Sequence, residues 1–306
     1  MTIKQIIPSH LQIETVSGYC SSRCIMCTYA TWTRQKGIMD FFTFKSIVDK
    51  FLPYRGNLEY VTIHGCGEPL LDPELEKKVQ YLKFHDFKGT GFATNCTHLF
   101  PDRSENLILA GLDTIICSVD GYKKETHEMI RVGTDFDEII KNIHLFIDLR
   151  NNYLKKGCKK VPRVIIRFIR QQLNYTEWDD YHSYWSSFLN TSIGDRVIYF
   201  DVHNWGDSLK KNSQQNVQLN YPKGKIICED IFSRMIIFAN GDVSFCCGDE
   251  NGFFQLGNVL IDDPIAIFNN EKFRTYREEM NNGNFFNLEY CKECTIPLSR
   301  LNKLKP

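Results

Sequence analysis

The chain has 306 residues, of which 42% are hydrophobic, and its 37 basic and 37 acidic side chains leave no formal net charge. This composition is typical of a folded globular protein, long enough for one large α/β domain and a small appendage. It excludes a basic nucleic-acid-binding surface, and the sequence has neither a signal-peptide pattern nor a membrane-length apolar run. We therefore expect a cytoplasmic protein, whose twelve cysteines point to metal or redox chemistry rather than to disulfides.

From about residue 10 to residue 205, short apolar runs alternate with amphipathic stretches of helical period. The predicted strands cover residues 11–16, 60–63, 89–93, 114–119, 164–169 and 197–200. The predicted helices between them cover residues 43–51, 73–84, 105–111, 136–150 and 176–188. Such βα repeats predict an α/β fold, a partial (β/α)6 TIM-like barrel with active residues at the C-terminal ends of its strands.

A run of three cysteines, Cys20, Cys24 and Cys27, follows the first predicted strand. The spacing gathers three thiolates around one point, one ligand fewer than a cubane iron-sulfur cluster needs. A cluster held in this way keeps one iron open to a ligand, whereas four cysteines would close it. The alternatives are a zinc site or scattered core cysteines, although structural zinc sites usually pair two such elements closer together.

This C-x3-C-x2-C run resembles the signature of the radical S-adenosylmethionine (SAM) enzymes. The resemblance implies a 4Fe-4S cluster on these cysteines, whose open iron binds SAM, and reductive cleavage of SAM to a 5'-deoxyadenosyl radical that abstracts hydrogen from carbon. Many members carry an aromatic residue before the last cysteine, near the adenine. Met26 takes that place here, and a polarizable thioether can pack on a purine.

The second predicted strand ends in a glycine-rich turn. Read alone, such a turn is weak evidence, since glycine also serves ordinary turns, and the alternative interpretation of Glu68 is a surface carboxylate. In the radical SAM family an element at this place holds the SAM amino group. The residues that resemble it are Gly65, Gly67, Glu68 and Pro69, with Cys66 where glycine is common.

Later strand ends also resemble family elements. Those that would line the ribose and methionine portion of SAM are Thr94, Asn95, Ser118 and Asp120. On the fifth predicted strand, Arg167 or Arg170 would pair with the SAM carboxylate through a charge-assisted contact. Residues three apart on a strand face opposite sides, so at most one of them points inward, and we prefer Arg167.

The C-terminal part contains a second set of cysteines, Cys228, Cys246, Cys291 and Cys294. Two apolar runs, 235–238 and 243–245, are joined by Asn240-Gly241, which predicts a hairpin with a type I′ turn that brings Cys228 and Cys246 together. Four thiolates suit either zinc or an iron-sulfur cluster. The pattern C-x12-G-x4-C followed by C-x2-C resembles the SPASM/twitch extension of radical SAM enzymes, and its short form implies one auxiliary 4Fe-4S cluster.

We accordingly predict a radical SAM barrel over residues 1–207, a linker over 208–225 and a SPASM/twitch-like domain over 226–306. Cys247 beside Cys246 has three interpretations: an alternative ligand, a small core residue, or a thiol that returns a hydrogen atom to a substrate radical. Cys66 is a second possible hydrogen donor. The remaining cysteines, Cys96, Cys117 and Cys158, are assigned to packing or to the surface.

The short twitch form resembles small aminocyclitol dehydrogenases, in which the auxiliary cluster accepts an electron from the substrate radical. We therefore expect oxidation of a small polar substrate, a sugar, cyclitol or nucleotide sugar. The candidate bases or hydroxyl contacts are His203, Asp207 and Arg170. A flavodoxin or ferredoxin is the expected reductant.

Other functions remain open. They are a sugar epimerase, which would return hydrogen from a cysteine, a peptide-modifying SPASM enzyme, and a non-catalytic electron-transfer protein. Only about ten residues precede the first predicted strand, which disfavours an N-terminal peptide-binding module and hence a peptide substrate. Glycyl-radical activation and sulfatase maturation are further options, the latter disfavoured by the expected single auxiliary cluster.

Overall fold

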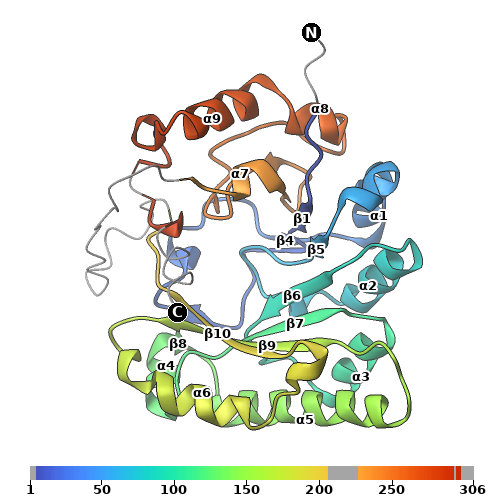
Figure 1. Cartoon of the computed structure of the whole chain (residues 1–306), viewed down its shortest axis with the longest axis vertical. Coiled ribbons are helices and arrows are strands. Elements are labelled where there is room, and N and C mark those ends of the chain that lie inside the picture. The colour runs from blue at the N-terminus through green and yellow to red at the C-terminus, as the bar shows by residue number, and fades with distance from the viewer. Residues whose placement is uncertain (1–4, 206–226, 293, 298–306) are drawn as a thin grey trace.

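The computed structural model describes residues 5–205, 227–292 and 294–297. One eight-stranded sheet runs through it in the order β10-β9-β7-β6-β5-β1-β11-β12 (Figure 1). The barrel strands are β1 (His10–Ile13), β5 (Tyr60–Thr62), β6 (Thr90–Thr94), β7 (Thr114–Ser118), β9 (Arg163–Arg170) and β10 (Arg196–Asp201). They pair in parallel, which confirms the predicted α/β fold and each of its predicted strands.

The two faces of the sheet differ because side chains alternate along a strand. Leu11, Ile13 and Val61 are fully buried on the face that packs against the helices. On the opposite face, Gln12 and His64 line a central cavity. One face of the sheet therefore builds the core, and the other carries polar groups into the interior.

The helices of the barrel lie on the outer side of the sheet (Figure 1). They are α1 (Phe41–Phe51), α2 (Leu75–Phe84), α3 (Pro101–Leu109), α4 (Lys124–Ile130), α5 (Phe136–Lys155) and α6 (Trp178–Ser186). Asp40 and Asp135 cap α1 and α5, each accepting a hydrogen bond from a backbone N–H three residues on. The short helix α4 was not predicted, because seven residues are too few to display a helical period.

Two small antiparallel ribbons hold the cysteine loop in place. One pairs β2 (Val16–Ser17) with β4 (Gly37–Ile38), and the other pairs β3 (Arg23–Cys24) with β8 (Arg131–Val132). In the second ribbon Cys24 lies directly opposite Arg131. The chain after α4 thus delivers a cationic side chain to the predicted cluster site.

The C-terminal segment continues the central sheet. Its elements are α7 (Asp230–Ser233), β11 (Arg234–Ile237), β12 (Val243–Ser244), α8 (Pro264–Phe268) and α9 (Glu271–Asn281). β11 pairs in parallel with β1 and antiparallel with β12, so the predicted C-terminal domain shares a sheet with the barrel. The predicted linker 208–225 lies outside the described residues.

The predicted hairpin is present, but its predicted type I′ turn is wrong. Gly241 has a φ of +87°, whereas Asn240 is not among the residues with positive φ, as type I′ would require at both positions. The Gly241 N–H bonds to the Phe238 carbonyl and the Phe238 N–H to the Asp242 carbonyl. This is a three-residue loop with glycine in the left-handed position, which the Asn-Gly pair serves equally well. No helix among the described residues has the length and apolar character to cross a membrane.

Candidate functional site

A cavity of about 320 Å³ lies inside the barrel, a size suited to small ligands. It brings together most of the residues predicted for the site. Those that line it are Cys20, Cys24, Met26, Cys27, Gly65, Cys66, Gly67, Glu68, Thr94, Asn95, Ser118, Arg167, His203 and Cys247. Residues on or after each of the six barrel strands therefore converge on one space, as the barrel topology predicts, and Cys247 of the C-terminal segment joins them.

Hydrogen-bond donors surround the sulfur atoms of the first cysteine set. The Ser22 N–H lies 3.4 Å from Cys20 Sγ, and the Asn95 amide lies 3.6 Å from the same sulfur. The Ser22 hydroxyl is 2.9 Å from Cys24 Sγ. Burial raises the pKa of Cys20 to about 11 and that of Cys27 to about 12, so these thiols ionise only when a positively charged group binds them. Three convergent thiols with donors around them fit an iron-sulfur cluster.

Arg131 belongs to this site although the sequence analysis missed it. Its Nη1 lies 3.6 Å from Cys24 Sγ, and its Nε donates to Asp120 Oδ2 at 2.7 Å. Arg131 begins strand β8 directly after helix α4, and this position could have indicated a role at the site. The sequence analysis did not use it because α4 was not predicted.

The prediction that Asp120 lines the SAM site is not supported by its surroundings. The Asp120 side chain is fully buried and does not line the cavity. One of its oxygens binds Arg131, and the other accepts the Ile169 N–H at 2.6 Å. Asp120 is therefore a positioning residue that holds Arg131 beside Cys24.

Glu68 is buried at the cavity wall with its carboxylate held by three donors. Thr94 Oγ1 donates at 2.6 Å, the Asn95 N–H at 2.8 Å and the Leu70 N–H at 3.1 Å. Burial raises the pKa of this carboxyl, although these hydrogen bonds act in the opposite direction. Pro69 does not line the cavity: it begins the 3-10 helix η3 (Pro69–Leu71) that turns the chain away from the site.

The two glycines of this turn are required by close contacts. A Cβ on Gly67 would lie 2.3 Å from the Val16 carbonyl oxygen, and one on Gly65 would lie 2.5 Å from Glu14 Cγ. Glu14 is buried, and its carboxylate accepts a hydrogen bond from each Nη atom of Arg34, at 2.9 and 2.7 Å. The Cys66 and Ala239 N–H groups bond to the same carboxylate, so this ion pair ties the glycine-rich turn to the C-terminal segment.

Of the two arginines considered on β9, Arg167 points inward. It lines the cavity and donates to Ser118 Oγ at 2.7 Å, while burial lowers its pKa to about 10. Arg170 faces the other way: its Nε binds Asp201 at 2.7 Å and its guanidinium lies 4.3 Å from the centre of the Tyr199 ring. The prediction of Arg170 as a base or substrate contact is therefore wrong, because strand alternation places it outside the cavity.

His203 lines the cavity, as predicted, next to Trp205. Its Nδ1 accepts the Trp205 N–H at 3.3 Å, so neutral His203 carries its proton on Nε2. The Trp205 indole in turn donates to the Met26 carbonyl at 2.8 Å, which connects this strand end to the cysteine loop. Asp207 lies outside the described residues.

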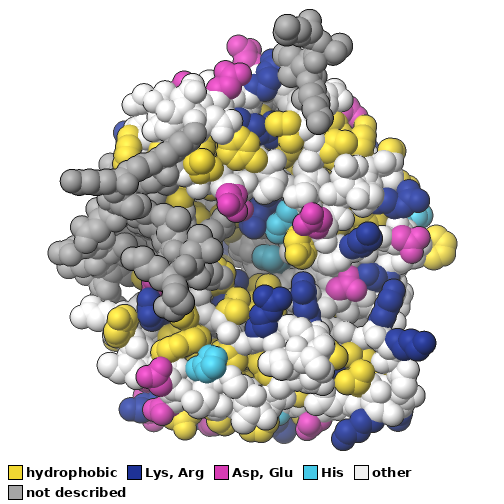
Figure 2. Space-filling model, in the orientation of Figure 1, with side chains coloured by type: hydrophobic (Ala, Val, Ile, Leu, Met, Phe, Trp, Pro, Cys, Tyr) yellow, Lys and Arg dark blue, Asp and Glu magenta, His cyan; other side chains and the backbone are white. Residues whose placement is uncertain are grey.

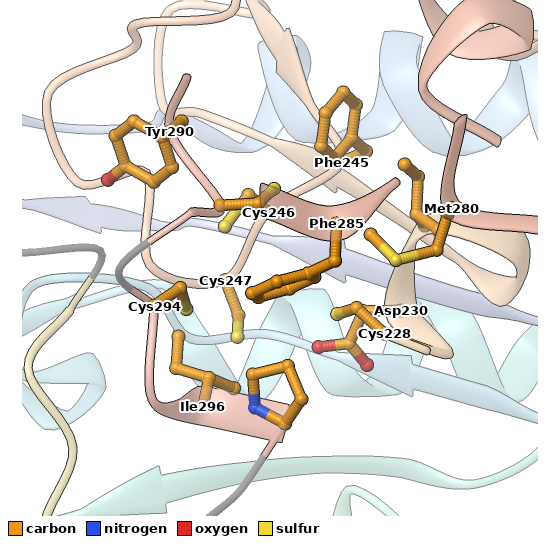
Figure 3. A pocket seen from close by; sticks show the side chains of 13 residues that line it. Cys228, Asp230, Phe245, Cys246, Cys247, Met280, Phe285, Tyr290, Cys294 and Ile296 are labelled. Carbon is orange, nitrogen blue, oxygen red and sulfur yellow. The ribbon is translucent and has the colours of Figure 1, made fainter. Parts of the chain in front are cut away.

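The second cysteine set surrounds a small cavity of about 20 Å³ (Figure 3). The cysteines that line it are Cys228, Cys246, Cys247, Cys291 and Cys294. Aromatic and aliphatic side chains, among them Phe245, Phe285 and Tyr290, complete its walls. The prediction that Cys228 and Cys246 lie together is confirmed. Across the described residues no group of three or more His, Cys, Asp or Glu side chains is arranged to hold a single metal ion, and a cubane cluster occupies a larger volume than one ion.

Few polar groups reach this second site. The Gly248 N–H lies 3.4 Å from Cys246 Sγ, and the Tyr290 hydroxyl donates to the Gly248 carbonyl at 2.5 Å. Burial raises the pKa values of Cys246 and Cys291 well above the ordinary thiol value. As at the first set, the thiols are expected to ionise only against a bound cationic group, and four or five of them fit a fully ligated cluster.

Cys247 is the residue shared by the two cavities, since it lines both of them. The other cysteines behave as predicted. Cys96 and Cys117 are buried in the core, and Cys158 is exposed.

Comparison with known proteins identifies both parts of the chain. The family model of the radical SAM superfamily matches residues 15–156, and that of an iron-sulfur cluster-binding domain, SPASM, matches residues 228–295. The chain carries a radical SAM domain followed by a SPASM domain. Its cofactors are accordingly a SAM-binding 4Fe-4S cluster, SAM itself and auxiliary iron-sulfur at the C-terminal cysteines, which resolves the choice between iron-sulfur and zinc.

Curated relatives match only the radical SAM part. A tungsten-containing aldehyde ferredoxin oxidoreductase cofactor-modifying protein of Pyrococcus furiosus is 30% identical over 111 residues, 36% of this chain and 30% of that protein. GTP 3',8-cyclase 1 of Mycobacterium tuberculosis is 29% identical over 136 residues, 42% of this chain and 37% of that protein. The chain thus spans about a third of the length of these relatives.

Solved structures resemble nearly the whole chain. BtrN in complex with AdoMet and 2-DOIA aligns with a TM-score of 0.65 and 17% identity over 95% of this chain and 94% of that one. Streptococcus suis SuiB bound to precursor peptide SuiA aligns with a TM-score of 0.65 and 16% identity over 89% of this chain and 67% of that one. At these identities the likeness establishes the fold.

Proposed function

We propose that this radical SAM protein is an enzyme that oxidises a small polar substrate, sugar-like or cyclitol-like, with the auxiliary cluster as electron acceptor. The observation that carries the proposal is the position of Cys247. It lines the cavity that contains Cys20, Cys24 and Cys27, and also the cavity that contains the four predicted auxiliary ligands. A substrate in the larger cavity is then separated from the auxiliary site by the wall to which Cys247 belongs.

When bound, SAM and its cluster supply a radical that removes a hydrogen atom from carbon, and the auxiliary cluster supplies a place for one electron. The protein's own residues orient these groups. Glu68 presents a carboxylate suited to the SAM amino group, and Arg167 presents a guanidinium suited to the SAM carboxylate. Arg131 and Asn95 donate toward the sulfurs that hold the cluster.

Oxidation of an alcohol to a ketone also releases the hydroxyl proton. His203 lies in the cavity, but with Nδ1 engaged by the Trp205 N–H its Nε2 is a donor. We therefore assign His203 to holding a substrate hydroxyl or carbonyl oxygen rather than to removing the proton. Asp207, a few residues further on, stays a candidate for that second role.

Epimerisation is the second candidate function, favoured by two thiols in the cavity wall. Cys66 and Cys247 both line the larger cavity. Burial raises the pKa of Cys66 well above the ordinary value, so it carries its hydrogen at neutral pH. An S–H group facing the substrate can return a hydrogen atom to a carbon radical, which changes its configuration without net oxidation.

The test is mass spectrometry of a sugar and cyclitol pool incubated in deuterium oxide with anaerobically reconstituted protein, SAM and dithionite. We expect a product lighter by two hydrogens, together with 5'-deoxyadenosine. A product of unchanged formula carrying one deuterium on carbon would replace oxidation by epimerisation. In that event Cys66→Ala and Cys247→Ala identify the donor, because only the donor's loss abolishes deuterium incorporation.

The control is the Cys24→Ala protein, in which neither product should form. SAM cleavage without any change in the pool would contradict a sugar or cyclitol substrate and favour a peptide. No 5'-deoxyadenosine from a chain that carries its full complement of iron would contradict the enzyme assignment itself and leave an electron-transfer protein.

A further inference from the structure

Three basic residues from three different strands face the central cavity. They are His64, which follows β5, Arg167 of β9 and Arg234 of β11. Among the described residues, one buried nitrogen of each has no hydrogen-bond partner: His64 Nδ1, Arg167 Nε and Arg234 Nε. On the face of the molecule shown in Figure 2, Lys, Arg and His side chains lie around a recess near the centre, with Asp and Glu side chains beside them. Buried polar nitrogens usually have a hydrogen-bond partner. A ligand bound in the cavity would supply the partners that these three lack.

The charges of the cavity wall do not balance. Within residues 5–205, 227–292 and 294–297, its lining contains three guanidinium groups, those of Arg131, Arg167 and Arg234, and one carboxylate, Glu68. Arg131 is matched by Asp120, and Glu68 is occupied by Thr94 and neighbouring N–H groups.

The other two arginines are less fully matched. Arg234 contacts Asp230 at 3.3 Å and Gln12 at 3.2 Å, and Asp230 sits in the wall of the auxiliary cavity. Arg167 has a hydroxyl, Ser118 Oγ, where a carboxylate partner would be expected. Among the described residues, Arg167 therefore has no carboxylate in an ion pair with it, whereas Arg234 is paired with Asp230 but keeps a buried Nε without a partner.

The potential in this part of the cavity is correspondingly positive. The pKa of His64 falls to about 3, first because of burial and then because of the positive charges of Arg167 and Arg234. His64 is thus a neutral imidazole at physiological pH, able to donate one hydrogen bond. An isolated buried guanidinium costs free energy that a bound anion recovers. A ligand with an ammonium group would be repelled by these positive charges and would bind more weakly.

We propose that the substrate of the reaction inferred above carries an anionic group, a phosphate or a carboxylate, which binds between Arg234 and His64, while Arg167 serves the SAM carboxylate. Arg234 brings this site to the auxiliary side of the cavity, because it lies on β11 of the C-terminal segment. SAM's own carboxylate requires one arginine, which leaves Arg234 and His64 for the substrate. The proposal narrows the substrate class from polar molecules in general to acidic ones, and it rests on the proposed function.

The experiment compares matched pairs of compounds on the reconstituted holoenzyme: glucose with glucose 6-phosphate, glucose with glucuronate, and inositol with inositol phosphate and with an aminocyclitol. The readout is 5'-deoxyadenosine formed above the substrate-free rate. We expect the acidic member of a pair to stimulate and the neutral or cationic member not to. Equal or greater stimulation by the neutral or cationic members would overturn the proposal.

Binding is measured separately so that the result does not depend on having the right sugar. Anaerobic calorimetry with inorganic phosphate, on protein that holds its clusters and SAM, should show one site per chain. Arg234→Gln should weaken that binding at least about tenfold, since a charge-assisted hydrogen bond is lost. Arg234→Lys should restore part of it, and the exposed Arg196→Gln should have no effect. Binding that is absent, or equal in Arg234→Gln and Arg196→Gln, would overturn the proposal.

The two proposals fail in distinguishable ways. If SAM is cleaved but phosphate does not bind and neutral sugars are oxidised, the anion site is wrong and the enzyme assignment stands. If phosphate binds in the Arg234-dependent way but SAM is never cleaved, the anion site stands and the enzyme assignment is wrong. An Arg234→Gln protein whose KM for SAM rises while phosphate binding is unchanged would reassign Arg234 to SAM, against the proposal.

Discussion

The two cysteine sets of this protein have opposite surroundings. Around Cys20 and Cys24 the neighbours are donors, namely Ser22, Asn95 and Arg131, and the thiols open onto a cavity of about 320 Å³. Around the C-terminal cysteines the neighbours are aromatic and aliphatic side chains together with Asp230, and the space between them is about 20 Å³. The first site leaves room for a ligand beside the cluster, whereas the second offers no comparable space for a ligand.

This difference matches two different uses of iron-sulfur chemistry. A cluster in polar, hydrogen-bonded surroundings with an open coordination site can bind and activate a molecule. A cluster enclosed by apolar groups, with all positions ligated, exchanges electrons without binding substrate. The roles that we propose for the two sites thus agree with their neighbours as well as with the number of cysteines.

Removing a ligand of the open site should have the largest effect. In Cys24→Ala we expect 5'-deoxyadenosine formation to fall to background, and iron to fall by about four atoms per chain, the content of one cubane. Chromatography of the nucleoside and iron analysis measure both. The matched control is Cys158→Ala, an exposed cysteine whose loss should change neither quantity. Persistent SAM cleavage in Cys24→Ala would contradict the cluster assignment.

Removing a ligand of the closed site should separate radical formation from oxidation. We expect Cys291→Ala to lose the auxiliary cluster and the oxidised product but to keep cleaving SAM, because the open site is intact. The measurement is the ratio of 5'-deoxyadenosine to product, with Cys158→Ala again as control. A ratio equal to that of the unaltered protein would show that the closed site is not the electron acceptor.

The sequence predicted the residues that line the open site better than the residues that hold them in position. The cysteines and the glycine-rich turn are local patterns, and parallel strand ends meet at one edge, so Cys24, Glu68 and Thr94 could be expected to line one cavity, as they do. Arg131 was missed because the antiparallel pairing that places it opposite Cys24 joins residues far apart in the chain. Asp120 was misjudged for the same reason: its partner could not be known before Arg131 was placed.

At the closed site, spacing indicated which cysteines gather but not how the segment attaches. The pairing of β11 with β1 joins the C-terminal segment to the barrel sheet across more than half of the chain, and no local pattern encodes such a contact. Arg170 shows the complementary limit. Strand alternation predicted correctly that Arg167 and Arg170 face opposite ways, but the Asp201 partner of Arg170 lies on another strand.

Replacing Arg131, which lies beside Cys24 in the open site, should lower the free energy of unfolding. Arg131→Gln removes the partner of fully buried Asp120, and breaking such a pair costs about 3–5 kcal/mol of unfolding free energy. Urea unfolding followed by tryptophan fluorescence measures it. Arg196→Gln, on the exposed start of β10, is the control and should change stability by less than about 0.5 kcal/mol. A similarly small change in Arg131→Gln would show that Asp120 is not dependent on this arginine.

The smallest predicted effect is a dependence of the free energy of unfolding on pH that arises from a histidine next to the open site. His127 is buried beneath this site, where its Nδ1 accepts the Asp120 N–H at 3.2 Å, and burial lowers its pKa to about 3. Because the unfolded chain binds this proton more tightly, stability is complete above pH 6.5 and is lost as the pH falls toward 3. At pH 5 the loss from this group amounts to about 2 kcal/mol relative to pH 7.

His127→Gln should remove that part of the pH dependence while preserving an acceptor for the Asp120 N–H, and exposed His182→Gln should leave it unchanged. Urea unfolding at pH 5 and pH 7 measures the difference for each protein. No histidine lines the closed cavity among the described residues, so acid should loosen the open site before the auxiliary one. If the free energy of unfolding changes equally between pH 5 and pH 7 in His127→Gln and His182→Gln, the acid sensitivity of the protein does not come from His127. The buried histidine next to the open site would then have no effect on stability at pH 5.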